Sequence, residues 1–395
     1  MQKATQQQTK EHNARLILKT IYDEGRISRA DIARLTGLTR TTVSDATAEL
    51  IEAGLIAEVG QGPSAGGKPP ILLSVVDNSR CLIGIDLADS EFRGAAINLR
   101  GAIKHRLGLP IHERDGDAAL AVVYQLIDGL VAAADSPILG IGIGTPGLVD
   151  AHQGVVRNAV NLDWHDLPLR QLLQDRYELP VYIANDSQVA ALAECTFGDS
   201  RGAANLVVIK VGRGTGAGIV LNRQLYYGDG FGAGEIGHVA VVEGGELCRC
   251  GHHGCLETVT STRGIVRRAQ AIARGGTPST LPQVAASPEE IDTDLLVQAL
   301  EKGDGAVRQA LTEAGQYLGI AAANLVSALN VQRIVIAGTA ARFGQTLVEP
   351  IIQGVRQRSL GVLADEVQIE TTRLGPDIVI LGAAALLLAQ ELGLP

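Results

Sequence analysis

Residues 234–257 read GEIGHVAVVEGGELCRCGHHGCLE and hold three of the five cysteines of the chain. His238, Cys248, Cys250 and Cys255 are soft ligands at close spacing, and four such side chains typically hold one zinc ion in tetrahedral geometry. Cys248 and Cys250 are too close to bridge each other, and the amino terminus does not resemble a secretion signal, so a disulfide is disfavoured. We expect a structural zinc site, because four protein ligands leave no position for a catalytic water.

Acidic side chains lie beside the predicted metal ligands. Glu235 precedes the histidine by three residues and Glu257 follows the last cysteine by two, so a bound metal would bring both carboxylates to one place. Asn185 and Asp186 follow a predicted strand and precede a predicted helix. Read alone this pair favours a helix cap, but an amide and a carboxylate also suit the hydroxyls of a sugar. Together with His238 these side chains predict a pocket for a neutral polyhydroxylated ligand.

The composition places the chain among water-soluble proteins with more than one domain. The 395 residues carry a net charge of -9, and 46% of them are hydrophobic. Every apolar run is interrupted before the roughly 20 residues that a membrane span needs, so we expect a cytoplasmic protein without a membrane partner. Residues 1–80 hold ten Lys or Arg against nine Asp or Glu, so this first segment lacks the acidic excess of the remainder.

Residues 1–76 predict a winged helix-turn-helix domain. An apolar helix covers residues 14–22, Ser28 caps a second helix, and Thr39 caps a third, with Gly37 in the turn between them. The sequence GLIAEVGQGPSAGGKPPILLSV predicts a two-stranded wing whose tip is Gly60–Lys68. One face of the unit is expected to bury Ile27, Ile32, Leu35, Leu38, Val43 and Leu50. A helical bundle used for protein contacts is the alternative.

The third helix is expected to enter the major groove of DNA. The side chains expected to face base edges and phosphates are Thr39, Arg40, Thr41, Thr42 and Ser44. Further phosphate contacts are predicted for Arg29, Arg34 and Lys68.

Residues 77–395 alternate strands with helices and predict an α/β fold of two related lobes. Strands are expected to begin at Cys81 and Asn205, each followed by a glycine-containing turn and a second strand. Ligands of such folds bind at the carboxyl ends of strands, in the crevice between lobes. Trp164, the one tryptophan of the chain, is predicted to anchor a loop in the core, and stacking against a ligand is the alternative.

These motifs resemble the ROK family (repressor, open reading frame, kinase), and the resemblance covers essentially the whole chain. It implies the actin-like (ribonuclease H-like) two-lobed sugar kinase fold, preceded by the winged helix-turn-helix domain. The family pattern places zinc on His238, Cys248, Cys250 and Cys255, within a loop spanning residues 238–255. It places sugar contacts on Asn185, Asp186, Glu235, His238 and Glu257, with further contacts at Gly147 and Asn158. His238 would give one ring nitrogen to zinc and turn the other to the sugar.

The sequence departs from the kinases of that family at the ATP site. Where they have Asp-x-Gly-Gly-Thr, the chain has Asp86-Leu87-Ala88-Asp89-Ser90. A side chain at Ala88 and a negative charge at Asp89 both oppose a polyphosphate. A second phosphate loop is kept as residues 214–218, and Gly338-Thr339 stands where the kinases have Gly-Gly near the adenine. We therefore expect a protein without catalytic activity.

The resemblance predicts a sugar-responsive transcriptional regulator, a repressor of carbohydrate uptake or metabolism genes for which the sugar is the inducer. Its partners would be a palindromic operator and a second copy of the chain, as a homodimer or a dimer of dimers. One alternative is an active ATP-dependent sugar kinase with a fused DNA-binding domain, in which Asp186 is the catalytic base. Another is a regulator that responds to a phosphotransferase protein instead of a sugar.

Overall fold

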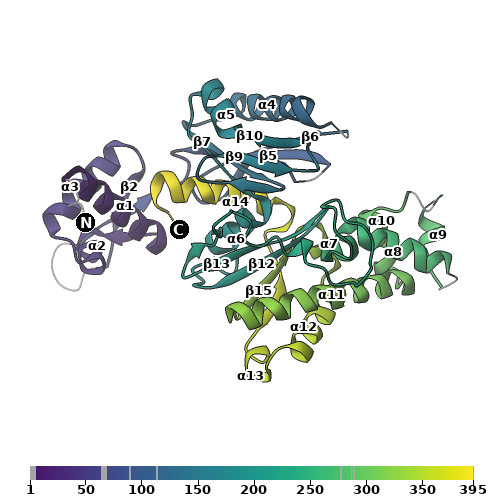
Figure 1. The fold of residues 1–395 in the computed structure, drawn as a ribbon. Coiled ribbons are helices and arrows are strands. Elements are labelled where there is room, and N and C mark those ends of the chain that lie inside the picture. The colour runs from purple at the N-terminus through teal and green to yellow at the C-terminus, as the bar shows by residue number, and fades with distance from the viewer. Residues whose placement is uncertain are drawn as a thin grey trace.

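The structure is a computed structural model that describes residues 6–63, 69–88, 90–112, 114–275, 278–285, 287 and 290–394. An amino-terminal unit of helices and a small sheet lies at one end, and two larger lobes with one central sheet each follow it (Figure 1). The carboxyl terminus lies next to the amino-terminal unit (Figure 1).

The amino-terminal unit has three helices and a three-stranded sheet of order β1-β3-β2. Its elements are α1 (Gln6–Glu24), β1 (Ile27–Ser28), α2 (Arg29–Thr36), α3 (Arg40–Glu52), β2 (Ile56–Gln61) and β3 (Ile71–Val75). The predicted caps are confirmed, since the Ser28 hydroxyl accepts a hydrogen bond from the Asp31 amide and the Thr39 hydroxyl accepts one from the Thr42 amide, both at 3.2 Å. Gly37 ends α2 with a φ of 70°, a left-handed conformation that suits glycine.

The expected burial of Leu35 is wrong, because this side chain is 52% exposed. Helix α2 packs through Ile32 and Ala33, and a contact face centred between those two positions turns Leu35 outward. Most of the predicted wing tip, including Lys68, lies outside the described residues.

The first lobe is built on a five-stranded sheet of order β11-β7-β4-β5-β6. Its strands are β4 (Cys81–Asp86), β5 (Glu91–Ile97), β6 (Ile103–Pro110), β7 (Ile138–Thr145) and β11 (Val181–Asn185). Helices α4 (Gly116–Ala132) and α5 (Leu169–Tyr177) cover its outer face (Figure 1). A small antiparallel sheet is added by β8 (Leu148–Asp150), β9 (Val155–Ala159) and β10 (Trp164–Leu167). Trp164 is buried and donates to the Gly116 carbonyl, as a core anchor should.

The second lobe is built on a sheet of order β14-β13-β12-β15-β16. Its strands are β12 (Leu206–Val211), β13 (Thr215–Leu221), β14 (Gln224–Leu225), β15 (Arg333–Ala337) and β16 (Gln368–Thr371). Its longer helices are α8 (Thr262–Arg274), α10 (Thr293–Glu301), α11 (Gly305–Leu329) and α12 (Gln345–Arg358). Its short helical segments are η1 (Ile236–His238), α7 (Leu256–Thr260), α9 (Leu281–Val284), η3 (Thr339–Phe343) and α13 (Gly361–Ala364).

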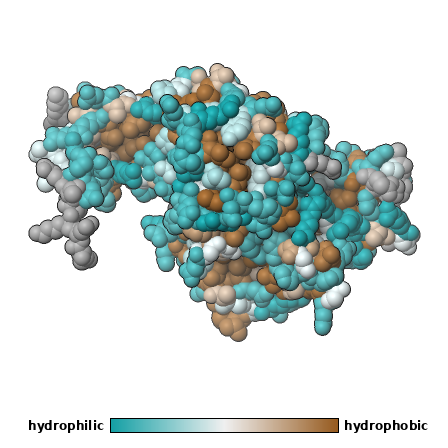
Figure 2. Space-filling view, turned by 45° about the horizontal axis from the view of Figure 1, so that its top comes forward, coloured by the Kyte–Doolittle hydropathy of each residue, from teal (hydrophilic) through white to brown (hydrophobic). Residues whose placement is uncertain are grey.

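The face of the molecule in Figure 2 is mostly hydrophilic, with small hydrophobic areas between the polar ones.

Helices α6 (Asp186–Thr196) and α14 (Ile378–Leu387) lie between the two sheets (Figure 1). The 3-10 turn η4 (Gly375–Asp377) precedes α14, and the π-helical turn η5 (Leu388–Leu392) follows it. Among the described residues one segment, Gly375–Leu392, is long and apolar enough to cross a membrane by those two criteria, and 61% of it is buried. Its position between two sheets accounts for its apolar composition.

The crossing of α6 and α14 depends on glycine. A Cβ atom added to Gly382 would lie 1.9 Å from the Val189 carbonyl oxygen, which is backbone and cannot rotate away. Replacing Gly382 by Ala is expected to lower the free energy of unfolding by about 2–3 kcal/mol, although alanine favours an isolated helix. Gly361→Ala is the control, because no described atom lies within 4 Å of its added Cβ. Equal denaturation midpoints in urea for the two variants would contradict the tight crossing.

The amino-terminal unit is bound to both lobes through α1. The Tyr22 hydroxyl donates to the Leu99 carbonyl at 2.9 Å, and Arg100 of the first lobe lies 4.0 Å from the centre of its ring. Arg201, in the connection between α6 and β12, lies 5.9 Å from the same ring and pairs with Asp23 at 3.7 Å. A change in the angle between the lobes would therefore move the contacts that hold α1.

Candidate functional site

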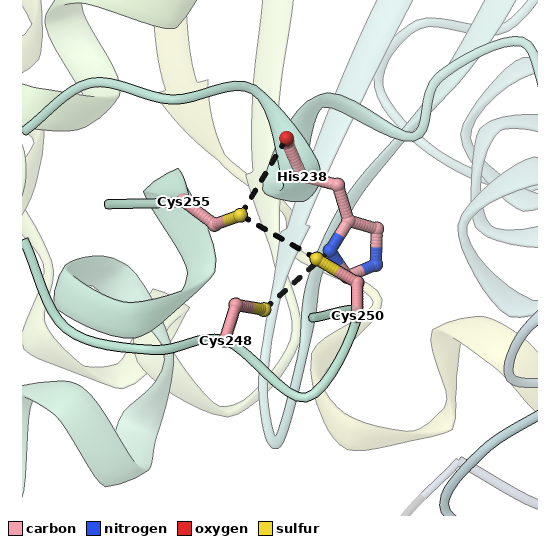
Figure 3. A group of neighbouring side chains, drawn as sticks. All are labelled: His238, Cys248, Cys250 and Cys255. Carbon is pink, nitrogen blue, oxygen red and sulfur yellow. Dashed lines mark hydrogen bonds between the residues drawn. The ribbon is translucent and has the colours of Figure 1, made fainter. Parts of the chain in front are cut away.

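The four predicted metal ligands meet in the second lobe. The ligand atoms of His238, Cys248, Cys250 and Cys255 all lie within 4.8 Å of one another. Figure 3 shows the three sulfur atoms and the imidazole ring turned toward a common centre. The Cys248 amide donates to the His252 carbonyl at 2.8 Å, which closes the turn that holds two of the sulfurs. Three sulfurs and one imidazole nitrogen fit the ligand preference of zinc.

The two ring nitrogens of His238 face different surroundings. Nδ1 lies 3.7 Å from the Cys248 sulfur, and Nε2 lies 3.8 Å from a carboxylate oxygen of Glu235. Binding a metal through Nδ1 would fix the tautomer and leave Nε2 to face a ligand.

The cysteine thiols differ in acidity. Burial acts to raise the pKa of Cys250, but hydrogen bonds from the backbone and ring of His252 and from the neighbouring thiols lower it to about 6. Burial and the neighbouring thiols raise the pKa of Cys255 to about 12. A divalent metal bound to the cluster would displace protons from the thiols.

A cavity of about 490 Å³ lies between the lobes, and it brings together every residue predicted to contact sugar. Those residues are Gly147, Asn158, Asn185, Asp186, Glu235, His238 and Glu257. Cys250 also lines the cavity, so the metal cluster and the cavity share a wall.

Asn185 has a structural role in the cavity wall. Its side-chain oxygen accepts hydrogen bonds from the amides of Ser187 and Gln188, which caps α6, and its amide group donates to the Gly147 carbonyl at 3.0 Å. Gly147 has a φ of 87°, and a Cβ there would lie 2.1 Å from the Asn158 carbonyl oxygen. The cap interpretation is therefore right for Asn185, and the cap also shapes the cavity.

Asp186 forms a buried ion pair with Lys210. The ammonium of Lys210 lies 2.8 Å from the Asp186 carboxylate, and the two side chains are 11% and 13% exposed. The other carboxylate oxygen accepts from the Ser187 amide at 2.8 Å. Asp186 begins α6 and Lys210 lies on β12, so the pair joins the central helix to the sheet of the second lobe. The Asp186 carboxylate is already paired with an ammonium, which makes it a weak base toward the hydroxyl of a ligand.

The remaining carboxylates line the same cavity. The Glu257 carboxylate accepts a hydrogen bond from the Thr215 amide at 3.0 Å, which ties α7 to β13. Burial raises the pKa of Glu235, and the nearby carboxylates of Asp186 and Glu257 raise it further, against the effect of His238.

A second cavity of about 540 Å³ corresponds to the predicted ATP site and also contains Lys210. Asp86 pairs with Arg93 at 2.6 Å, and the Ala88 amide donates to the Asp86 carboxylate at 3.0 Å. Asp89 lies outside the described residues. The second phosphate loop was predicted at residues 214–218, but Thr215 already begins β13. The turn itself lies earlier in the sequence, at Gly212–Gly214.

The residues predicted to contact DNA lie in and around α3. Thr39, Arg40, Thr41 and Ser44 are exposed and Thr42 is half-buried. Arg29 pairs with Glu58 at 3.0 Å and donates to the Thr47 hydroxyl, while Arg34 pairs with Asp31 at 2.9 Å.

Known sequences and structures match this arrangement. The pattern of the ROK family matches residues 82–390, and that of winged helix-turn-helix DNA-binding proteins matches residues 10–57. The chain belongs to the ROK family. It is 34% identical over 391 residues to the xylose repressor of Caldicellulosiruptor bescii, covering 98% of each chain. This confirms the predicted family and the amino-terminal winged helix-turn-helix domain.

Solved structures of ROK proteins confirm the fold. A ROK family transcriptional regulator described as a homologue of the Escherichia coli MLC protein matches with a TM-score of 0.85, 31% identity and 98% coverage of each chain. A ROK family glucokinase from Streptomyces griseus, in complex with glucose and AMPPNP, matches with a TM-score of 0.72 and 27% identity. That match covers 78% of this ROK protein and 98% of the glucokinase, so the shared part is the two-lobed sugar kinase fold.

The cavity residues that sequence reasoning missed include Lys210, Arg249 and Asn161. A charge inside the otherwise apolar strand LVVIKV is the signal that could have pointed to Lys210. Arg249 and Asn161 lie in turns and carry no comparable signal.

Proposed function

We propose that this ROK protein is a sugar-responsive transcriptional repressor without kinase activity. One observation carries the proposal: a winged helix-turn-helix unit is joined to a cavity that gathers all seven predicted sugar contacts, with Asp186 already paired to Lys210. The similarity to a protein named xylose repressor supports the same function.

The ligand of the cavity would be a neutral sugar. The acidic side chains Asp186, Glu235 and Glu257 outnumber the basic Lys210 and Arg249 along the wall, which disfavours an anionic ligand. Hydroxyl groups can donate to these carboxylates, and the Nε2 atom of His238 faces the same space. Zinc bound by His238 and the three cysteines would act structurally, by holding the imidazole at the cavity wall.

DNA binding would be carried by residues 1–76, and sugar and zinc binding by residues 77–395. Helix α3 would present Thr39, Arg40, Thr41, Thr42 and Ser44 to the major groove, with Arg29, Arg34 and Lys68 near phosphates. A homodimer or dimer of dimers in the cytoplasm would place two α3 helices roughly 34 Å apart on a palindromic operator. Sugar would change the angle between the lobes and, through the Tyr22 contacts, that spacing.

An active sugar kinase is the second candidate, because the fold is shared with a glucokinase. The paired Asp186, the Asp86–Arg93 ion pair and the side chain of Ala88 oppose it. A coupled assay for ADP release with glucose, xylose and N-acetylglucosamine separates the two candidates, since only a kinase consumes ATP.

Operator binding tests the repressor directly. We expect Arg40→Ala to weaken binding to a promoter fragment from the chain's own gene region by about tenfold or more, because an arginine contact to a base or phosphate is lost. Arg308→Ala, which removes an exposed arginine from α11, is the matched control. Fluorescence anisotropy with and without sugar measures both effects, and sugar must weaken operator binding by the factor by which the operator weakens sugar binding. Operator affinity that no sugar alters would refute sugar-responsive repression.

A further inference from the structure

A hydrogen bond crosses the mouth of the cavity between the lobes. The guanidinium of Arg249 donates through Nη1 to the side-chain oxygen of Asn161, and both residues line the cavity. Arg249 belongs to the second lobe and Asn161 to the small sheet of the first, 88 residues apart in the sequence. Both are exposed, whereas Asp186 and Lys210 are buried at the floor, so the contact lies at the rim.

Arg249 lies in the turn that carries two of the predicted metal ligands. It stands between Cys248 and Cys250 in a turn closed by a hydrogen bond from the Gly251 amide to the Cys248 carbonyl at 2.9 Å. Gly251 has a φ of 89°, which glycine adopts without strain. Metal bound to the flanking sulfurs would fix the backbone on both sides of Arg249 and so aim its side chain at the rim.

Asn161 is anchored just as firmly. It lies in the turn between β9 and β10, where the Leu162 amide donates to the Ala159 carbonyl at 2.9 Å. Leu162 and Trp164 are buried, and the Gly116 amide donates to the Leu162 carbonyl at 2.8 Å. The turn is thus fixed to the first lobe, and a hydrogen bond to Asn161 holds that lobe directly.

We propose that Arg249 and Asn161 form a clasp that closes the cavity over a bound monosaccharide and excludes longer sugars. Arg249 is a positioning and specificity residue in this proposal, which rests on the proposed sugar binding. A sugar at the floor must break the clasp to leave, so the clasp sets the dissociation rate. A disaccharide would need the space that the clasp occupies. Removing the clasp should therefore allow a disaccharide to bind.

Trp164 provides the readout, because it is the one tryptophan of the chain and lies three residues after Asn161. Stopped-flow fluorescence with D-xylose, D-glucose and N-acetylglucosamine gives association and dissociation rates on the full-length protein. We expect Arg249→Ala to raise the dissociation rate about tenfold, the loss typical of a hydrogen bond from a charged donor, and to raise the association rate as well, because the clasp is already closed in the free protein. Asn161→Ala should have the same effect, and the double variant should be no worse than either single one. Arg249→Ala should also bind the disaccharide of the responding sugar.

The matched control is Arg267→Ala, which removes an arginine that pairs with Glu246 of the same loop at 2.6 Å. Hydrogen exchange of residues 160–163 in the free protein tests the clasp without any sugar, and we expect it to rise about tenfold in Arg249→Ala alone. Wild-type protein that binds none of the sugars would refute the proposed function, while the exchange experiment would still decide the clasp. Dissociation and exchange rates of Arg249→Ala equal to those of Arg267→Ala would overturn it.

Discussion

Replacing Cys250 by Ser is expected to remove zinc and the sugar response together. A hydroxyl is a poor zinc ligand, so we expect zinc affinity to fall by at least about 100-fold. His238 would lose its fixed tautomer and Arg249 its fixed backbone, and sugar affinity should fall by about 10- to 100-fold. The winged helix-turn-helix unit lies far from the loop (Figure 1) and should stay folded. The variant should therefore bind operator DNA that sugar no longer releases.

Three measurements check this result, namely zinc content by atomic emission, sugar binding by calorimetry and operator binding by anisotropy. Cys195→Ala is the control, because it removes a half-buried thiol of α6 that is not part of the cluster. Loss of zinc with undiminished sugar affinity would reduce the metal to a staple of its own loop. Loss of operator binding would show that the cluster supports the whole fold.

Replacing Asp186 by Asn is expected to weaken both sugar binding and the fold. The variant removes the carboxylate that pairs with the buried Lys210 ammonium, and breaking a buried ion pair from one side typically costs about 3–5 kcal/mol. A hydroxyl that donated to a carboxylate would meet a neutral amide, so sugar affinity should fall by about 10- to 100-fold. Urea denaturation measures the first effect and calorimetry the second.

The double variant Asp186→Asn with Lys210→Met separates stability from binding. It removes both charges, and the free energy of unfolding should recover most of the loss. Sugar affinity should stay low, because the carboxylate is still missing. A double variant that regains sugar binding would show that Asp186 acts on the fold alone, and one that stays as unstable as the single variant would refute the buried pairing.

The helical caps and the order of elements were predictable because their causes are local. Ser28, Thr39 and Asn185 each bond to amides within three residues, so the sequence near each one contains both partners. The burial of Leu35 was not predictable in this way. Which face of α2 turns inward depends on α1 and α3, and the apolar spacing within α2 does not fix that angle.

The sequence by itself determined the cluster of one histidine and three cysteines, the winged helix-turn-helix unit and the two-lobed fold. The metal ligands lie within 18 residues of one another, so a short loop brings them together whatever surrounds it. Only the tertiary structure decided which residues pair at the floor of the cavity and at its rim. Lys210 meets Asp186 across 24 residues and Arg249 meets Asn161 across 88, in each case on different elements. Such pairs form only when packing fixes the angle between helix and sheet or between lobe and lobe, and no local pattern encodes that angle.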